Sequence, residues 1–296
     1  MSTCFLVSST TKFRELPEFQ DGNGATGEWQ QMRIDILTLF PDMVSGALNH
    51  SIVGRAIRSG VVDIRVHDLR QWTTDRHRTA DDVPFGGGAG MVLKAEPLMQ
   101  AVSDICDGSL TERAERILLC PQGDVLSQAT IARLAALPRI LLVCGHYEGI
   151  DDRVRTSMID RQVSVGDFVV SGGELPALIL ADAIVRLQPG ALGSPESAVD
   201  ESHTAGLLEY PHFTRPASVN GQEVPQVLRS GDHKAIDEWR RMQSISRTRE
   251  RRPDLYARWW VALQVRRSIE TPAMPKRTRR GVSRARPELP GGTIVV

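Results

Sequence analysis

The chain has 296 residues, of which 41% are hydrophobic and 24% are charged, which excludes wholesale disorder and allows a large buried core. No apolar run approaches the roughly eighteen residues of a membrane span, and residues 1–31 lack the basic start and apolar core of a secretory signal. The net charge is zero, but residues 229–296 hold 17 basic and 7 acidic groups, a balance of +10. This basic block suits either a polyanionic partner or a solvated helical face with a basic tail.

The four cysteines show neither paired spacing nor the spacing of metal ligands. They are Cys4, Cys106, Cys120 and Cys144. This usage fits a reducing compartment. We therefore expect a cytoplasmic protein with no membrane span and no metal ligands.

Short apolar runs alternate with helical patterns after a flexible extension at residues 1–31. Strands are predicted at 33–40, 61–66, 116–120, 140–144 and 163–170, and helices at 43–58, 95–106, 127–137 and 175–187. This alternation predicts an α/β fold with a mostly parallel sheet covered on both faces. Beyond a linker, residues 228–241 and 255–267 predict amphipathic helices, and 276–286 predicts a disordered, arginine-rich tail.

Three glycine-rich segments, 83–91, 144–151 and 166–174, are the most informative feature of the sequence. Glycine permits positive φ angles and close backbone approach, so we expect one ligand held by backbone groups at strand ends. The segments match neither a P-loop nor the G-x-G-x-x-G pattern of dinucleotide sites. Zinc clusters and the G-x-S-x-G elbow of hydrolases are also missing from the sequence. An adenosine-containing ligand without a triphosphate fits such a site.

Several motifs then occur in a specific order, from about Met32 to Pro253. They include Pro84–Met91 (PFGGGAGM), Gly145–Asp151 (GHYEGID), Ser171–Pro176 (SGGELP) and Pro211–Pro216 (PHFTRP). In these motifs the chain resembles the bacterial tRNA (guanine-N1)-methyltransferases, the TrmD family. The resemblance implies a SPOUT-type parallel sheet with a deep trefoil knot, plus a small all-α C-terminal domain. It also implies a homodimer that uses S-adenosylmethionine to methylate guanosine 37 of tRNA, with magnesium as a possible aid.

The same resemblance divides the chain into five parts. A flexible extension (1–31) precedes the knotted donor-binding methyltransferase domain (32–192). A linker (193–206) leads to a helical tRNA-binding domain (207–268), and a basic disordered tail (269–296) ends the chain.

Methylation at N1 of guanine requires a base, because this nitrogen carries a proton at neutral pH. The family places an aspartate in the linker, usually within an acidic-Asp-Ser sequence, where this chain has Asp200-Glu201-Ser202. Strict register selects Glu201, whereas a shift of one residue selects Asp200, which we favour. Arg186 matches a family arginine that steadies the donor or guanine O6. Without the resemblance, Asp200 and Glu201 would be interpreted as solvated acids of a linker, and Arg186 as a charge that interacts with the end of a helix.

The remaining site residues are also implied by the resemblance. The donor-binding positions are Pro121, Gln122, Gly145, Tyr147, Glu148, Gly149, Val165, Gly166, Phe168, Val170, Gly172, Gly173 and Pro176. The tRNA-binding positions are Asp82, Arg76, Arg78, Ser202, Glu209, Arg215 and His233. This chain has His146 where relatives commonly have arginine, and either a weakened phosphate contact or a plain loop histidine would explain it. Phe85 and Phe168 stand where relatives commonly have tyrosine.

Two alternatives stay open. The altered Asp200-Glu201 pair is compatible with a catalytically silent member that binds donor and tRNA without turnover. The fold and donor are also compatible with another RNA target, such as ribosomal RNA or a ribose hydroxyl.

Overall fold

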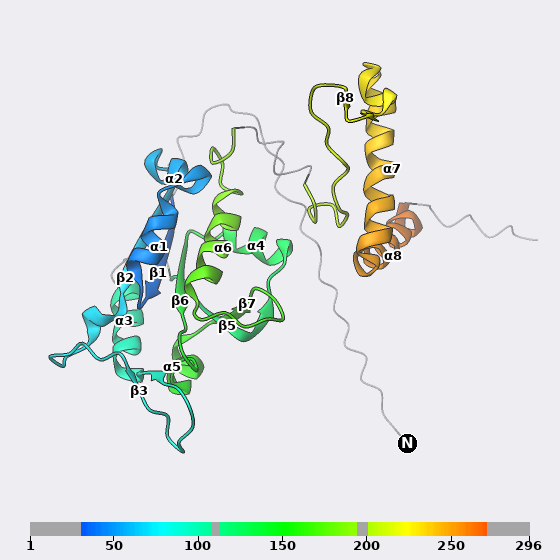
Figure 1. Ribbon diagram of the computed structural model, residues 1–296. Helices are drawn as coiled ribbons and strands as arrows, with labels where there is room; N and C mark the ends of the chain where they lie inside the picture. The colour runs from blue at the N-terminus through cyan, green and yellow to red at the C-terminus, as the bar shows by residue number, and fades with distance from the viewer. Residues whose placement is uncertain (1–30, 108–112, 194–200, 271–296) are drawn as a thin grey trace, which may run out of the picture.

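The centre of the molecule is a sheet of five parallel strands in the order β2-β1-β6-β5-β7 (Figure 1). The computed structural model describes residues 31–107, 113–193 and 201–270. The strands are β1 (Met32–Thr38), β2 (Val62–Asp68), β5 (Glu115–Val125), β6 (Arg139–Cys144) and β7 (Arg161–Ser164). The predicted parallel α/β sheet is confirmed.

Two separate apolar clusters cover the faces of the sheet, because successive strand residues point to opposite sides. In the central strand β6, Ile140 and Leu142 lie in one cluster, whereas Leu141 and Val143 lie in the other. Helices of the first cluster are α1 (Pro41–Leu48), α2 (Ser51–Arg58), α4 (Gln128–Ala135) and α6 (Glu174–Val185). Helices of the second are α3 (Ala95–Asp107) and α5 (Asp152–Met158). The expectation of a sheet covered on both faces is confirmed.

Several predicted elements are wrong in extent; the strand expected at 116–120, for example, runs from Glu115 to Val125. The single helix expected at 43–58 is two helices, because Ser51 takes a φ of 55° and turns the chain between α1 and α2. The strand expected at 163–170 ends at Ser164. There the Ser164 hydroxyl group bonds both the carbonyl oxygen and the amide of Gly166, which closes a turn and ends the strand. Residues 165–170 are therefore free to form a loop.

The polar stretch predicted as a loop at 70–90 contains short elements. A 3-10 helix, η1 (Leu69–Trp72), precedes a small antiparallel pair, β3 (Asp81–Asp82) with β4 (Val92–Leu93). The pair carries the first glycine-rich segment between its strands. This arrangement turns segment 83–91 into an exposed loop, in which the Phe85 side chain is fully exposed.

The C-terminal part contains a hairpin, a 3-10 turn and two helices. These are β8 (Ser218–Val219), β9 (Gln222–Glu223), η3 (Gln226–Arg229), α7 (His233–Arg251) and α8 (Pro253–Glu270). The helix expected at 228–241 begins later, because Asp232 caps it by accepting a hydrogen bond from the Ala235 amide at 3.1 Å. The flexible extension and the disordered tail expected at 1–31 and 269–296 lie outside the described residues, except for residue 31 and for residues 269–270, which end helix α8 instead of beginning a tail.

A fully buried carboxylate, Asp35, lies within the sheet on β1. It accepts hydrogen bonds from Arg33 at 2.8 Å and Arg139 at 3.1 Å, and lies 2.8 Å from His67 Nε2. Burial opposes ionisation of Asp35, but the hydrogen bonds from His67 and Arg33 outweigh it and lower the pKa of the carboxyl group. This cluster ties three neighbouring strands together.

Candidate active site

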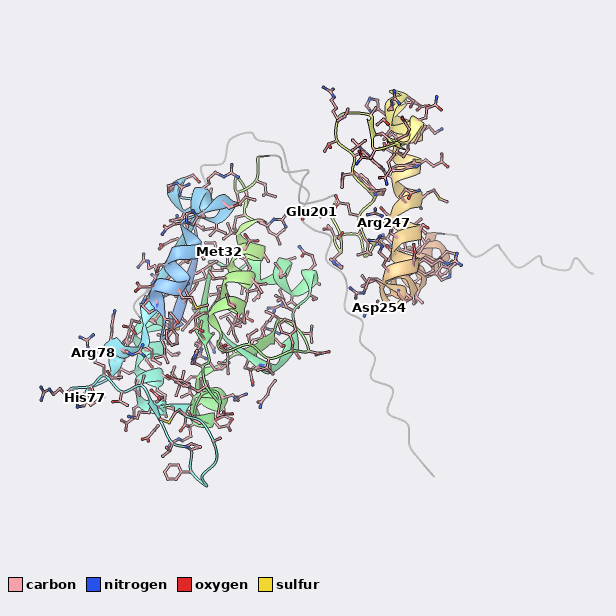
Figure 2. The ribbon with its side chains drawn as sticks, viewed as in Figure 1. Met32, His77, Arg78, Glu201, Arg247 and Asp254 are labelled. Atoms are coloured by element: carbon pink, nitrogen blue, oxygen red, sulfur yellow. The ribbon has the colours of Figure 1, made fainter. Side chains whose placement is uncertain are left out.

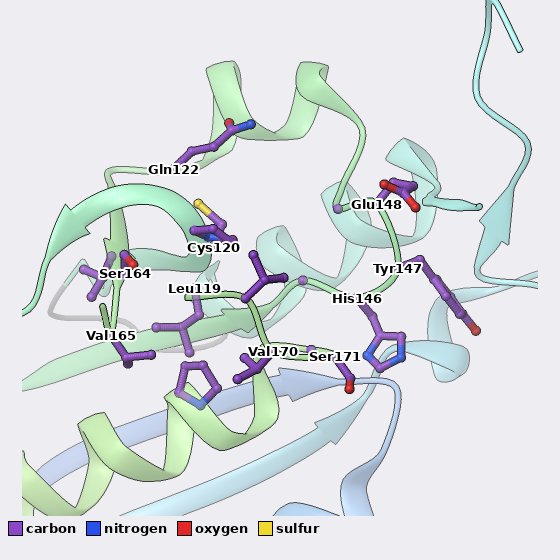
Figure 3. Close-up of a pocket in the computed structure, with 18 of the residues that line it drawn as sticks. Leu119, Cys120, Gln122, His146, Tyr147, Glu148, Ser164, Val165, Val170 and Ser171 are labelled. Carbon is purple, nitrogen blue, oxygen red and sulfur yellow. The ribbon is translucent and has the colours of Figure 1, made fainter. Parts of the chain in front are cut away.

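A cavity of about 260 Å³ opens at the carboxyl ends of β5, β6 and β7 (Figure 3). In open parallel sheets, ligands bind at such strand ends. Twelve of the thirteen residues predicted to bind the donor line it: Pro121, Gln122, Gly145, Tyr147, Glu148, Gly149, Val165, Phe168, Val170, Gly172, Gly173 and Pro176. Gly166 does not line the cavity and instead lies beneath the Phe168 ring, which a β-carbon at Gly166 would meet at 2.6 Å.

Only two of the three glycine-rich segments form the cavity walls. Segment 83–91 contributes no lining residue, which corrects the expectation that all three surround one ligand. It supports the second segment from outside. The Glu148 amide donates to the carbonyl oxygen of Met91 at 3.1 Å, and the Glu148 side chain fills the space beside Gly90. The third wall comes from the end of β5, at Pro121 and Gln122.

Two glycines allow the backbone segments around the cavity to pack in direct contact. A β-carbon at Gly123 would lie 2.3 Å from the Val163 amide nitrogen, and one at Gly173 would lie 2.6 Å from the Cys144 α-carbon. Gly173 also donates its amide proton to the Gly145 carbonyl oxygen at 2.7 Å. Larger residues would push these segments apart, so the glycines set the width of the cavity.

Arg155 on α5 is a lining residue that sequence reasoning missed. Its Nη1 donates to Gln122 Oε1 at 2.6 Å and to Gln162 Oε1 at 2.9 Å, so one guanidinium group joins the ends of β5 and β7. Arg155 was missed because helix α5 is too short and polar to be predicted from the sequence. Asp151 nevertheless marks its start, because its carboxylate accepts a hydrogen bond from the Arg153 amide at 2.9 Å.

The cavity chemistry fits a donor such as S-adenosylmethionine. Apolar side chains of Leu119, Val165 and Val170 offer a surface for a flat aromatic ring (Figure 3). Backbone groups of the glycine-rich turns and the Gln122 side chain offer hydrogen bonds for sugar and amino acid groups. Next to the cavity, burial and the negative charge of Glu174 raise the pKa of the Cys144 thiol well above its usual range.

Arg186 and Glu201 form a salt bridge at the far end of α6. Arg186 is the residue at which α6 ends, and its Nη2 donates to Glu201 Oε1. The hydrogen bond that Arg186 donates to Glu201 raises the pKa of the Arg186 guanidinium group. About 30% of the Arg186 side chain and 28% of the Glu201 side chain are exposed, so both remain accessible to a ligand. Asp200 lies outside the described residues.

Ser202 and Glu209, two predicted tRNA-binding residues, lie side by side. The Glu209 amide donates to Ser202 Oγ at 3.0 Å, and Glu209 Oε1 lies 2.6 Å from His212 Nε2. They line a second cavity of about 340 Å³, together with Leu208, Tyr210, Pro211, His212, Arg247 and Arg251. The two arginines come from α7 and were not predicted individually; Figure 2 shows Arg247 on that helix.

The other predicted tRNA-binding residues line neither of these two cavities. Arg76 and Arg78 are exposed in a turn held by Asp75, and Figure 2 shows His77 and Arg78 projecting outward. Asp82 is exposed on β3. Arg215 and His233 are exposed on the C-terminal part.

The described residues contain neither a metal-binding cluster nor a membrane-spanning helix. No three His, Cys, Asp or Glu residues within 31–107, 113–193 and 201–270 are placed to hold a metal ion. Within the same ranges, no helix combines the length and apolar character needed to cross a membrane.

Comparison with known proteins gives consistent matches. The sequence profile of a family described as "tRNA (Guanine-1)-methyltransferase TrmD" matches residues 32–258. A protein from Chloroflexus aurantiacus named tRNA (guanine-N(1)-)-methyltransferase is 58% identical over 228 residues, which cover 77% of this chain and 89% of that protein. A protein of the same name from Moorella thermoacetica is 48% identical over 239 residues, covering 81% and 96%.

Proposed function

Because the chain belongs to the tRNA (guanine-1)-methyltransferase family TrmD, we propose that it methylates N1 of guanosine 37 in tRNA with S-adenosylmethionine as donor. The observation that carries this proposal is the convergence of twelve predicted donor-binding residues on one cavity at the strand ends. The position within tRNA, the donor and the individual residue roles are our inference.

The donor cavity would bind S-adenosylmethionine through backbone groups of the turns at 145–149 and 170–173, with Gln122 beside them. When bound, this molecule supplies a methyl group activated on a positively charged sulfur. The chain's own contribution is orientation and exclusion of water. The glycine contacts keep the cavity narrow, and Arg155 fixes the Gln122 amide.

We infer that Glu201 is the base, although the sequence analysis favoured Asp200. Arg186 donates a hydrogen bond to the Glu201 carboxylate, and this contact orients the carboxylate and supports its role as the base. The carboxylate would accept the N1 proton of guanine, and the Arg186 guanidinium would stabilise negative charge developing on O6. The glutamate side chain is longer than that of aspartate by one methylene group, so Glu201 can reach the same proton.

The tRNA would contact basic groups on both parts of the chain. Arg76 and Arg78 lie in the turn before β3, and Arg247 and Arg251 of α7 line the second cavity together with Ser202 and Glu209. Arginine side chains that neutralise phosphates release counterions, so such binding weakens with salt. The second cavity would then receive part of the RNA near the methylated base.

We also propose the homodimer, the trefoil knot and the cytoplasmic location that the family implies. An apolar surface supports the dimer. Phe40 and Met43 at α1 and Leu175 and Ile179 on α6 are 38–51% exposed, and α1 packs against α6. Such a surface is typical of a subunit interface. Size-exclusion chromatography with light scattering tests it, since Met43→Asp and Ile179→Asp are expected to give monomers.

The deciding experiment incubates the purified full chain with labelled S-adenosylmethionine and two tRNA transcripts, one with guanosine and one with adenosine at position 37. We expect label only in the guanosine transcript, at N1 by mass spectrometry of the nucleosides. Label at another nucleoside would identify a different RNA target. Binding of donor and tRNA without label would identify a silent RNA-binding member.

A further inference from the structure

Glu174 is an ionisable residue whose position is unusual. It is the first residue of α6, and its side chain is only 3% exposed. A buried carboxylate is destabilising unless it is partnered, so its partners indicate what it does. Its Oε1 accepts a hydrogen bond from Thr38 Oγ1 at 2.7 Å. The Thr38 hydroxyl oxygen in turn accepts a hydrogen bond from the Phe40 amide at 2.9 Å, which joins Glu174 to the end of β1.

The other oxygen of Glu174 lies beside a residue of the donor cavity wall. Glu174 Oε2 lies 3.6 Å from Nδ1 of His146, a residue of the cavity wall. This distance exceeds that of a hydrogen bond, so the two groups are in close contact without a hydrogen bond between them. Among the described residues, His146 Nδ1 is buried and has no hydrogen-bond partner. The ring also lies 4.8 Å from Phe40 and 4.7 Å from Tyr147, measured between ring centroids.

His146 starts the tight turn that forms one side of the cavity (Figure 3). Its carbonyl oxygen accepts a hydrogen bond from the Gly149 amide at 3.0 Å, and its backbone bridges to Gly172 on the opposite wall. A β-carbon at Gly172 would lie 2.3 Å from both His146 Nδ1 and Glu174 Oε2. The imidazole and the carboxylate therefore fill the space between the two walls, and Gly172 leaves room for both.

We propose that Glu174 and His146 are a positioning pair, in which the buried carboxylate anchored by Thr38 holds the imidazole, and with it the 146–149 turn, in the shape that binds the donor. This inference rests on the proposed function. Neither residue takes part in proton transfer. The pair acts through the turn, so its loss affects donor affinity and leaves the chemical step intact.

The test measures S-adenosylmethionine binding to the full chain by calorimetry. His146→Ala and Glu174→Gln are each expected to weaken donor binding about tenfold. The double variant is expected to bind no more weakly than the single variant with the lower affinity, because contacting residues are coupled. His146→Lys, which places an ammonium group near Glu174, is expected to bind better than His146→Ala. The KM for donor should rise in these variants while kcat stays unchanged. Unchanged affinities, or losses that add fully in the double variant, would overturn the pair.

Two controls separate positioning from general stability. Thr38→Val removes the hydrogen bond to Glu174 and is expected to weaken donor binding severalfold, which tests the anchor if Glu174→Gln does not fold. Asp35→Asn alters another buried carboxylate within the sheet, and it should lower Tm without changing donor affinity. Equal loss of affinity in Asp35→Asn would overturn the proposal. A wild-type chain that binds no donor would contradict the proposed function, whereas normal wild-type binding with unaffected variants contradicts only this inference.

Discussion

The donor side and the acceptor side of the site are built in different ways. The donor cavity lies at the ends of buried parallel strands, and glycines at which a β-carbon would lie 2.3–2.6 Å from neighbouring backbone allow its walls to pack in direct contact. The proposed acceptor side consists of a linker residue, Glu201, the end of α6 at Arg186, and arginines on a turn and a helix. The donor cavity is therefore built from buried strand ends and backbone contacts, whereas the proposed acceptor side depends on a few polar side chains.

This difference separates two kinds of sensitivity. Substitutions on the donor side disturb packing and therefore change stability and donor affinity together. Substitutions on the acceptor side remove single charged groups, which changes turnover or RNA affinity and leaves the fold intact. Substitutions on each side of the site test whether stability and turnover separate in this way.

The largest effect is expected at the linker carboxylate. Glu201→Gln should lower kcat/KM by about 10³-fold, because general-base catalysis contributes about 10²–10⁴. Donor affinity by calorimetry should not change. Asp200→Asn is the matched control and should lose far less activity. A larger loss in Asp200→Asn would assign the base to Asp200.

Removal of the partner arginine should have the next largest effect. Arg186→Ala is expected to lower kcat by about 10²-fold, the size seen when one charge-stabilising donor is lost. The combination with Glu201→Gln should lose less than the product of the two single losses, because the residues form one ion pair. Single-turnover rates measure this. Full multiplication of the losses would show that the two side chains act separately.

On the donor side, Gly173→Ala is expected to reduce the free energy of unfolding by about 1–3 kcal/mol and to weaken donor binding. A β-carbon there would lie 2.6 Å from the Cys144 α-carbon. Gly145→Ala is the matched variant, since its nearest neighbour would lie at 3.5 Å, an ordinary contact. Thermal unfolding and calorimetry should therefore separate the two. Equal stability of both variants would contradict a cavity width set by backbone contact.

The arginines proposed to contact tRNA should give smaller effects. Arg78→Ala and Arg247→Ala are each expected to weaken tRNA binding severalfold and to reduce the salt slope of log affinity by just under 1. Arg113→Ala is a suitable control, because Arg113 is exposed but paired with Asp160. Titrations at several salt concentrations measure the slopes. An unchanged slope in Arg78→Ala and Arg247→Ala would remove these residues from the RNA surface.

The smallest effect concerns acid stability of the donor side. A hydrogen bond from Arg116 lowers the pKa of Asp160 to about 2, from its ordinary 3.8. A lowered pKa means that the stabilisation is complete above about pH 4 and is lost as pH falls towards about 2. Because the side chain is about a quarter exposed, we expect about 1 kcal/mol. Asp160→Asn should remove this part of the acid sensitivity in urea unfolding at pH 3–7. An unaltered pH profile would show that the ion pair contributes nothing.

Much of the donor side could be predicted from sequence, because buried parallel strands and glycine-rich turns leave strong local patterns. The residues at 140–144 are apolar on both faces, as a central strand requires. The acceptor side leaves weak patterns. The Arg186–Glu201 salt bridge joins residues 15 apart through a linker with no periodicity, and α5 with Arg155 is too short and polar to predict. The turn at Ser51 gave no signal either, since its φ of 55° is rare for serine.

The environment of Cys144 bears on the selectivity of methyl transfer. A sulfonium compound alkylates any accessible thiolate, and a thiolate next to its own binding site would be a competing acceptor. Burial and the neighbouring Glu174 charge keep this sulfur in its neutral, weakly nucleophilic form. Cys144 is therefore a poor acceptor for the methyl group of a sulfonium donor bound as proposed.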